Sequence, residues 1–147
     1  MKLIANNRKA RFNYAVEEEI EAGLMLMGSE VKSIREGKIT IGDGYVAQQK
    51  NDLVLMNVHI AEYKGANRFN HTPMRPRKLL LHKKQIVKLI SKVETKGYSI
   101  IPLAVYFNEK NIAKVKIGLC KGKKLYDKRA SIKERDEKRR MARGLDE

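Results

Sequence analysis

A chain of 147 residues is long enough to bury one core but too short for two domains of ordinary size. Its 32 lysines and arginines exceed its 17 aspartates and glutamates, and the formal charge of +15 predicts a polyanionic partner. No stretch approaches the roughly 18 to 20 consecutive apolar residues of a membrane-spanning helix, and residues 1–13 lack the apolar core of a signal peptide. We therefore expect a cytoplasmic protein without a membrane partner.

The N-terminal part of the chain predicts a basic arm and then a strand. Residues 1–11 contain basic but no acidic residues, and we expect this arm to run along the surface. In residues 12–27 apolar residues are interrupted by glutamates, which predicts a strand that bends at Gly23. The glutamates of this strand are expected to face solvent.

A short helix and two strands are predicted next. Ser29 can cap a helix through Arg35, and Gly37 can end it. Residues 45–49 and 53–60 predict two strands on either side of a polar turn. One face of the second strand is fully apolar, so that face is expected to point into the core.

The clearest helical periodicity covers residues 82–93, whose apolar side chains recur at spacings of three and four residues. Residues 100–107 and 112–119 predict two strands joined by a polar hairpin turn. In the second of these strands Lys114 and Lys116 alternate with apolar residues, which predicts one basic face. The single cysteine excludes an intramolecular disulfide, and we expect it to be a small apolar residue of the core.

Together these elements predict a mainly β fold with short helices. Closing a sheet removes its exposed edges, so we expect residues 1–126 to form an OB-like closed antiparallel β-barrel. Residues 127–147 mix basic and acidic residues with little apolar content and cannot form a core. We expect them to be a flexible C-terminal tail that is disordered when free.

The tail has local signals for a helix. Ser131 and Glu134 have the spacing of a capping box, and Glu134 with Lys138 and Asp136 with Arg140 form favourable pairs four residues apart. An isolated helix of this length is marginal in water. A frayed solubilising tail is one alternative; a segment that becomes helical on a partner is the interpretation that the residues favour.

Two groups of basic residues predict contact with a phosphate backbone. The first lies in a stretch without any acidic residue and comprises Lys64, Arg68, Arg75, Arg77, Lys78, Lys83, Lys84, Lys88 and Lys92. The second comprises Lys114, Lys116, Lys121, Lys123 and Lys124. A solvated face balanced by distant acids is the alternative, but the excess of basic residues up to residue 126 argues against it.

Several side chains near these groups could recognise unpaired bases. A ring stacked on a base contributes roughly 1 to 3 kcal/mol, although each ring could equally pack in the core or a turn. Asn67 and Asn70 could reach base edges or 2′-hydroxyl groups. The rings in question are those of Tyr63, Phe69, His71 and Tyr106.

Catalytic and metal-binding groups are not brought together by the sequence. The three histidines, His59, His71 and His82, lie on separate predicted elements, and neither paired cysteines nor an HExxH spacing occurs. Residues 118–124 lack the glycine spacing and the Ser or Thr of a nucleotide-binding loop. We therefore expect no enzymatic activity, no cofactor and no metal ion.

Seven short motifs occur along the chain in the order Asn7-Arg8-Lys9-Ala10, Glu21-Ala22-Gly23, GSEVKSIR from Gly28, Arg77-Lys78-Leu79-Leu80-Leu81, Lys114-Val115-Lys116-Ile117-Gly118, Gly122-Lys123-Lys124 and Asp127-Lys128-Arg129. They resemble the bacterial SsrA-binding proteins, or small protein B. The resemblance implies an OB-like barrel that binds the transfer-RNA-like domain of transfer-messenger RNA and delivers it to stalled ribosomes. It also implies that the tail, helical on the ribosome, occupies the empty decoding site and messenger channel. The implied further partners are the small ribosomal subunit with its ribosomal RNA, and elongation factor Tu through the shared RNA.

The resemblance also implies roles for individual residues. A carboxylate repels phosphate, so Glu30 would accept hydrogen bonds from a base or a 2′-hydroxyl, or orient a neighbouring cation. Tyr126 stands where some family members have His, a change that preserves stacking but not a role for a protonated imidazole. RNA contact is implied for Asn7, Arg8, Lys9, Glu30, Lys32, Lys121, Lys123 and Lys124. Contact with the decoding site is implied for Tyr126, Asp127, Lys128 and Arg129.

The residues by themselves leave two rival functions open. An ordinary ribosomal protein or RNA chaperone would be present on all ribosomes rather than on stalled ones. An RNA-modifying enzyme would need a clustered catalytic set or a cofactor-binding loop, and the sequence groups neither.

Overall fold

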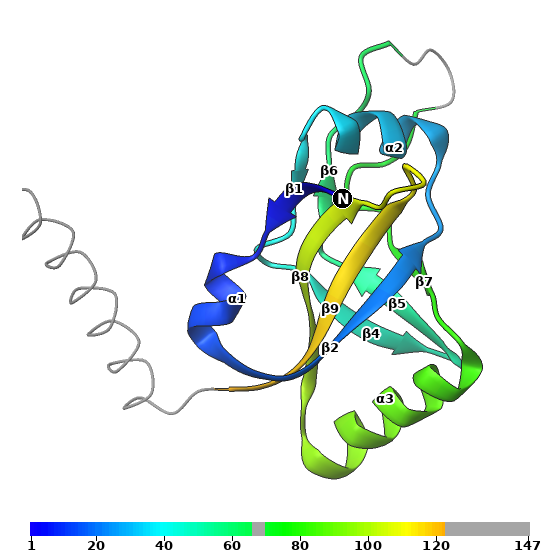
Figure 1. The fold of residues 1–147 in the computed structure, drawn as a ribbon. Coiled ribbons are helices and arrows are strands. Elements are labelled where there is room, and N and C mark those ends of the chain that lie inside the picture. Colours follow the sequence, from blue (N-terminus) through cyan, green and yellow to red (C-terminus); the bar gives the residue numbers. More distant parts are fainter. Residues whose placement is uncertain (66–69, 123–147) are drawn as a thin grey trace, which may run out of the picture.

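The computed structural model describes residues 1–65 and 70–122 (Figure 1). The predicted mainly β character with short helices is confirmed for these residues. The strands are β1 (Lys2–Asn6), β2 (Tyr14–Leu24), β3 (Ile39–Thr40), β4 (Tyr45–Gln49), β5 (Asp52–Met56), β6 (His59–Ile60), β7 (Arg77–Leu80), β8 (Ser99–Phe107) and β9 (Ala113–Gly122). The helices are α1 (Arg8–Asn13), α2 (Gly28–Arg35) and α3 (Lys83–Lys96).

Seven strands form one antiparallel sheet in the order β1-β8-β9-β2-β7-β5-β4, and β3 pairs with β6 separately. The prediction of a closed barrel is wrong for the described strands, since β1 and β4 remain as edges of this sheet. β4 contacts β8 without pairing with it. The reason is that β8 pairs with β9 on one side and with β1 on the other, and the amide of Asn7 donates to Leu103 O beside β1.

Residues 1–11, which were predicted to run along the surface, are mostly exposed, but they form regular structure that was not predicted. β1 adds to the sheet beside β8, and α1 follows after Asn7. The Asn7 side chain accepts a hydrogen bond from the Ala10 amide at 3.0 Å, which caps the helix. The side-chain nitrogen of Asn7, Nδ2, donates to Ile41 O at 3.3 Å and to Pro102 O at 2.8 Å. Asn7 thus ties the start of the chain to the sheet.

The predicted strand at residues 45–49 is confirmed, whereas the predicted strand at residues 53–60 is divided. β5 ends at Met56, and Asn57 adopts a left-handed φ of 59°. β6 then pairs with β3 instead of continuing the main sheet. Leu53, Val54 and Leu55 are all buried, so both faces of β5 are covered and not only the predicted one.

The two predicted helices are confirmed within a few residues. α3 ends at Gly97, whose φ of 66° is a left-handed conformation that glycine adopts without strain. α2 is followed by Gly37, with a φ of 77°. Its N-cap is Met27 rather than the predicted Ser29, because the Glu30 carboxylate accepts a hydrogen bond from the Met27 amide at 2.8 Å. None of the helices among the described residues is long and apolar enough to cross a membrane.

The C-terminal hairpin matches the prediction. β8 and β9 pair along most of their length, with Val115 and Ile117 buried and Lys114 and Lys116 partly exposed. Cys120 is fully buried, and burial raises the pKa of its thiol to about 11, consistent with its predicted place in the core. β7 was not predicted as a strand, because the basic residues around it obscure its short apolar pattern.

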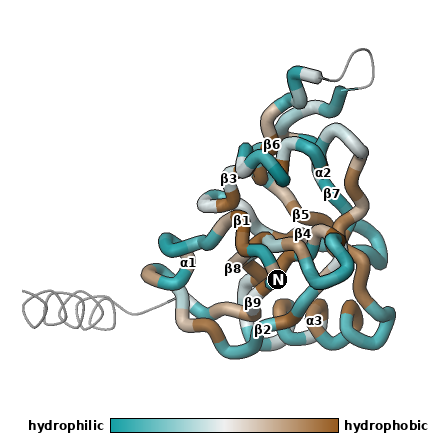
Figure 2. Tube along the Cα trace, turned by 45° about the horizontal axis from the view of Figure 1, so that its top comes forward, coloured by the Kyte–Doolittle hydropathy of each residue, from teal (hydrophilic) through white to brown (hydrophobic). Residues whose placement is uncertain are grey.

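The core is enclosed by the sheet together with α2 and α3, and its buried aliphatic residues come mainly from β2, β5, β6, β7, β8, β9, α2 and α3. In Figure 2 the tube is hydrophobic where strands pass through the interior and hydrophilic along much of its outer surface. α2 and α3 lie toward opposite ends of the sheet (Figure 1). The long strands β2, β8 and β9 connect these two ends.

Candidate nucleic-acid interface

A buried ionic network centred on Glu30 joins α2 to β7. Glu30 and Arg77 are both fully buried, and Arg77 Nε donates to Glu30 Oε2 at 2.5 Å. Arg75 donates to Glu30 Oε1 at 2.5 Å, and Arg77 also donates to Val58 O and Pro73 O. Burial by itself raises the pKa of Glu30, but the hydrogen bonds from Arg75, the Met27 amide and Arg77 lower it below its usual value. Glu30 therefore stays ionised inside the protein.

This network changes how the predicted role of Glu30 must be understood. No part of its side chain is exposed, and both of its oxygens accept hydrogen bonds within the protein. Asn7 is likewise buried and fully used by α1, Ile41 and Pro102. The structure thus places two of the eight residues predicted to contact RNA beneath the surface, where they hold helices in position.

Other residues predicted to contact RNA lie on the surface. Arg8 and Lys9 are exposed on α1, and Lys9 donates to Asp43 at 2.8 Å. The hydrogen bond and the charge of Asp43 raise the pKa of Lys9 above its usual value. Lys32 is exposed on α2, with its ammonium 5.4 Å from the centre of the Tyr63 ring. α1 and α2 therefore both present cations to solvent.

The rings that were predicted to stack on bases are mostly occupied within the fold. His71 is buried between Ser29 Oγ and Ile60 O, at 2.8 and 2.9 Å, and Tyr106 is buried in β8. The Tyr63 ring contacts Lys32, and Gly65 approaches it so closely that a Cβ there would lie 2.8 Å from the ring. Phe69 lies outside the described residues, as do Asn67 and Arg68. The core alternative is thus confirmed for His71 and Tyr106.

The expectation that the first basic group lacks acidic partners is wrong for five of its nine residues. Arg75 and Arg77 pair with Glu30, Lys78 pairs with Asp52, and Lys88 and Lys92 pair with Glu18. Lys92 is the main cause of the lowered pKa of Glu18. These acids are distant in sequence, and the sheet brings them beside the basic residues.

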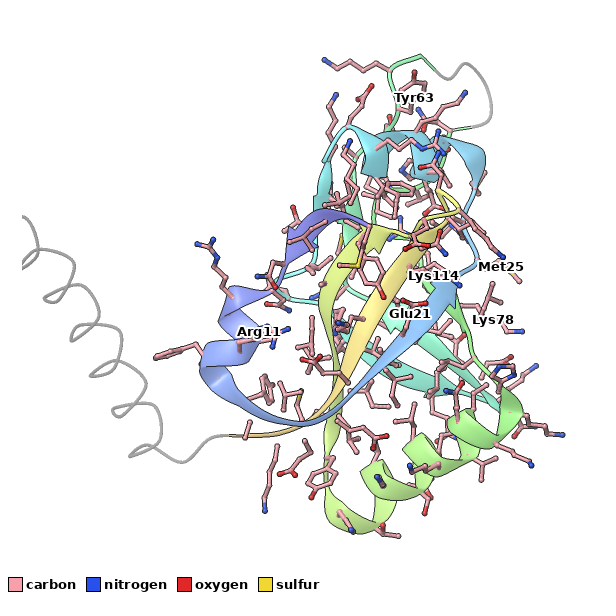
Figure 3. All side chains as sticks on the ribbon, viewed as in Figure 1. Arg11, Glu21, Met25, Tyr63, Lys78 and Lys114 are labelled. Atoms are coloured by element: carbon pink, nitrogen blue, oxygen red, sulfur yellow. The ribbon has the colours of Figure 1, made fainter. Side chains whose placement is uncertain are left out.

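A groove of about 580 Å³ opens on the face where β2, β7 and β9 meet the start of α3, and we call it the β2–β7–β9 groove. Glu21, Lys78 and Lys114 lie along this side of the sheet, with Met25 nearby (Figure 3). A Cβ at Gly23 would lie 3.2 Å from Leu80 Cβ and 3.7 Å from Lys114 Nζ, so the glycine leaves the floor of the groove open. Leu80 is 49% exposed, although it is a large apolar residue.

Glu21 on β2 is held in place by Tyr106 on β8, the strand beyond β9. The Tyr106 hydroxyl donates a short hydrogen bond to the Glu21 carboxylate, while the Tyr106 ring is buried. Burial and the adjacent Glu21 raise the pKa of Tyr106 above its usual value, so the hydroxyl keeps its proton. The groove therefore combines an oriented acceptor, two ammonium donors and an apolar side chain. One of the two donors, Lys78, pairs at 3.5 Å with Asp52, which also lines the groove, and both side chains are open to solvent. Such a set suits a nucleotide, with its phosphate, base edge and ring face, better than a bare phosphate.

The sequence predicts solvated faces for the glutamates of β2 and does not bring Lys78, Leu80 and Tyr106 together as one site. The Glu21-Ala22-Gly23 motif was a signal of their importance. Its link to Tyr106 and Leu80 depends on strand pairing, which the motif does not show.

The family described as SmpB protein matches residues 4–147. The chain belongs to this family. The SsrA-binding protein of Wolbachia pipientis subsp. Culex pipiens (strain wPip) is 57% identical over 143 residues, which are 97% of this chain and 96% of the relative. The SsrA-binding protein of Orientia tsutsugamushi (strain Ikeda) is 55% identical over 142 residues, 97% of this chain and 93% of the relative.

A solved SmpB structure has a similar fold. It comes from work titled "tmRNA-SmpB: a journey to the center of the bacterial ribosome", and its TM-score to this chain is 0.68 at 45% sequence identity. The match covers 82% of this chain and 85% of that chain. This similarity supports the mainly β fold of the SmpB family for the described residues.

The remaining residues with predicted contacts are at the end of β9 or beyond it. Lys121 is exposed and pairs with Ala15 at the start of β2, which directly follows α1. Lys121 on β9 therefore lies beside the start of β2, the strand that follows Arg8 and Lys9 of α1 in the chain. Six further residues lie outside the described part of the chain, namely Lys123, Lys124, Tyr126, Asp127, Lys128 and Arg129.

Proposed function

We propose that this member of the SmpB family binds transfer-messenger RNA and acts as its adaptor in trans-translation on stalled ribosomes. One observation carries the proposal: proteins named SsrA-binding proteins align with 97% of the chain at 55 to 58% identity. The solved relative, whose title names transfer-messenger RNA, SmpB and the ribosome, supports the same assignment. The charge of +15 fits two RNA partners.

The β2–β7–β9 groove is our candidate for direct contact with the transfer-RNA-like domain. Lys78 and Lys114 supply ammonium donors for phosphates, and Glu21 can accept hydrogen bonds from a base or a 2′-hydroxyl. Leu80 offers an apolar surface for the face of a base or ribose. The exposed cations Arg8, Lys9, Lys32 and Lys121 extend the contact over α1, α2 and the end of β9.

Asn7 and Glu30 contribute indirectly in this proposal. Asn7 caps α1 and so positions Arg8 and Lys9, whereas Glu30 caps α2 and so positions Lys32. Loss of either side chain would displace surface cations as well as weaken the fold. A defect in RNA binding at these positions therefore does not require direct contact.

The C-terminal residues have a separate role in this proposal. Lys123 and Lys124 would contact phosphates of transfer-messenger RNA, and residues 126–129 would contact ribosomal RNA at the decoding site. Residues 127–147, a tail disordered when free and helical on the ribosome, would occupy the decoding site and messenger channel. The protein would act in the cytoplasm as a binding adaptor without catalysis, and elongation factor Tu would join through the shared RNA.

Deletion of residues 127–147 tests the proposal. Transfer-messenger RNA affinity, measured by gel shift, should stay within about threefold, because the charge excess lies in the preceding residues. Tagging of chains on stalled ribosomes, measured in reconstituted translation, should be abolished. If the deletion abolished both RNA affinity and tagging, the proposal that the tail and the preceding residues have separate functions would be contradicted. If tagging stayed complete without the tail, the adaptor proposal itself would be contradicted.

A further inference from the structure

A second groove, of about 490 Å³, lies between α1, the loop at residues 42–44, β4 and the start of β8. Tyr14, Tyr45 and Tyr98 line it, and we call it the tyrosine groove. It shares no lining residue with the β2–β7–β9 groove. The two grooves are therefore separate sites.

The three tyrosines come from distant parts of the chain and are held by different contacts. Tyr14 packs against the small core cluster of Ala10, Ile101, Leu103 and Cys120. Tyr98 packs against the main core, and Tyr45 begins β4, where 45% of it is exposed. Packing on one side holds Tyr14 and Tyr98 while leaving part of each residue exposed at the groove.

The loop that carries Tyr45 is held close to the sheet. A Cβ at Gly44 would lie 2.7 Å from Val58 Cγ2 and 2.9 Å from Pro102 Cγ, so only glycine allows this approach. The Gly44 amide donates to Ile41 O at 2.9 Å. Tyr45 is therefore fixed near α1 and the start of β8 and does not swing with a free loop.

The rim of the groove is polar. Lys9 and Asp43 pair at 2.8 Å across its mouth, and their side chains are 65% and 72% exposed. The ion pair is open to solvent, so a phosphate can compete with Asp43 for the Lys9 ammonium. Aromatic rings beside a cation are the combination by which proteins bind unpaired nucleotides. The volume lies within the range of about 300 to 1,000 Å³ usual for small-molecule sites.

We propose that the tyrosine groove binds an unpaired nucleobase of an RNA by stacking against Tyr45, with Lys9 contacting the adjoining phosphate. This site goes beyond the proposed function, because it gives the protein a nucleobase contact away from the β2–β7–β9 groove.

Titration of the full chain with hexaadenylate tests the proposal by the NMR signals of the tyrosine rings. We expect saturable shifts of Tyr14, Tyr45 and Tyr98, whereas ribose 5-phosphate at equal concentration should leave these signals unchanged. Equal shifts with ribose 5-phosphate would show simple anion binding and overturn the proposal. Absence of ring shifts with hexaadenylate would overturn it as well.

Substitutions at Tyr45 give a second test. Tyr45→Ala should weaken hexaadenylate binding by roughly 5- to 150-fold, the loss expected for one stacked base, whereas Tyr45→Phe should keep most of the affinity. Ile112→Ala, which removes another half-exposed apolar side chain on the distant β8–β9 hairpin, is the matched control. Unchanged affinity of Tyr45→Ala would overturn the proposal without affecting the proposed function. If Tyr45→Ala unfolds, the titration of the unaltered chain decides.

Discussion

The two sides of β7 show how one short strand supplies both a structural network and a binding surface. Arg77 and Leu79 are buried, whereas Lys78 and Leu80 are exposed. Arg77 points inward and pairs with Glu30, and Lys78 faces the β2–β7–β9 groove. Side chains of a strand alternate between its faces, so adjacent cations can have different functions. Counting basic residues along the sequence cannot separate them.

The largest expected effect is on the buried side. Arg77→Leu would leave Glu30 buried with Arg75 as its remaining arginine partner, and breaking such a pair costs about 3 to 5 kcal/mol. We expect the urea midpoint to fall accordingly. The double variant Glu30→Leu with Arg77→Leu should recover part of the loss, because no unpaired buried charge remains. A change below about 1 kcal/mol in Arg77→Leu would contradict the network's structural role.

On the exposed side, the expected effect is on RNA affinity rather than stability. The double variant Lys78→Ala with Lys114→Ala should weaken transfer-messenger RNA binding by roughly 50-fold at 0.1 M salt. If each lysine neutralises one phosphate, the slope of log K against log salt concentration should become shallower by about 1.8. Filter binding across a salt series measures both quantities. Lys110→Ala, in the exposed turn of the β8–β9 hairpin, is the matched control and should change neither. An unchanged slope in the double variant would remove the groove from the interface.

Low pH should weaken the buried side of β7, because the ionised Glu30 carboxylate contributes to the stability of the fold. Its pKa in the folded protein lies below its value in the unfolded chain, so folding favours the ionised form. This contribution is present above the unfolded pKa of roughly 4.3 and is lost as the pH falls through the folded pKa. Below pH 4.3, Glu30→Gln should therefore flatten the dependence of unfolding free energy on pH, by up to about 1.4 kcal/mol per pH unit. Parallel curves for the two proteins would contradict this assignment.

The smallest expected effect concerns the exposed pair of Lys9 and Asp43. Asp43→Asn should leave the urea midpoint unchanged within error, because solvent and salt screen this pair. The same change should not weaken hexaadenylate binding, since it frees the Lys9 ammonium. A clear loss of stability would show that the pair is structural, as the Glu30 network is.

Local patterns predicted the elements whose residues interact mainly with their sequence neighbours. The periodicity of α3 and the polar turn between β8 and β9 fall into this class, as do the glycines that follow α2 and α3. At the start of the chain, the capping role of Asn7 could have been predicted from its position before a short helical segment. β1 could not have been predicted in this way, because its stability comes from pairing with β8, about a hundred residues away.

The sequence by itself determined the charge excess, the mainly β character and the family, since each depends on residue types and their order. The tertiary structure alone decided which charges are buried, which rings are free and that the sheet stays open. Glu30 and Arg77 are 47 residues apart, and Tyr106 and Glu21 are 85 residues apart. Such pairs form only when strands come together, because burial and hydrogen bonding depend on neighbours in space.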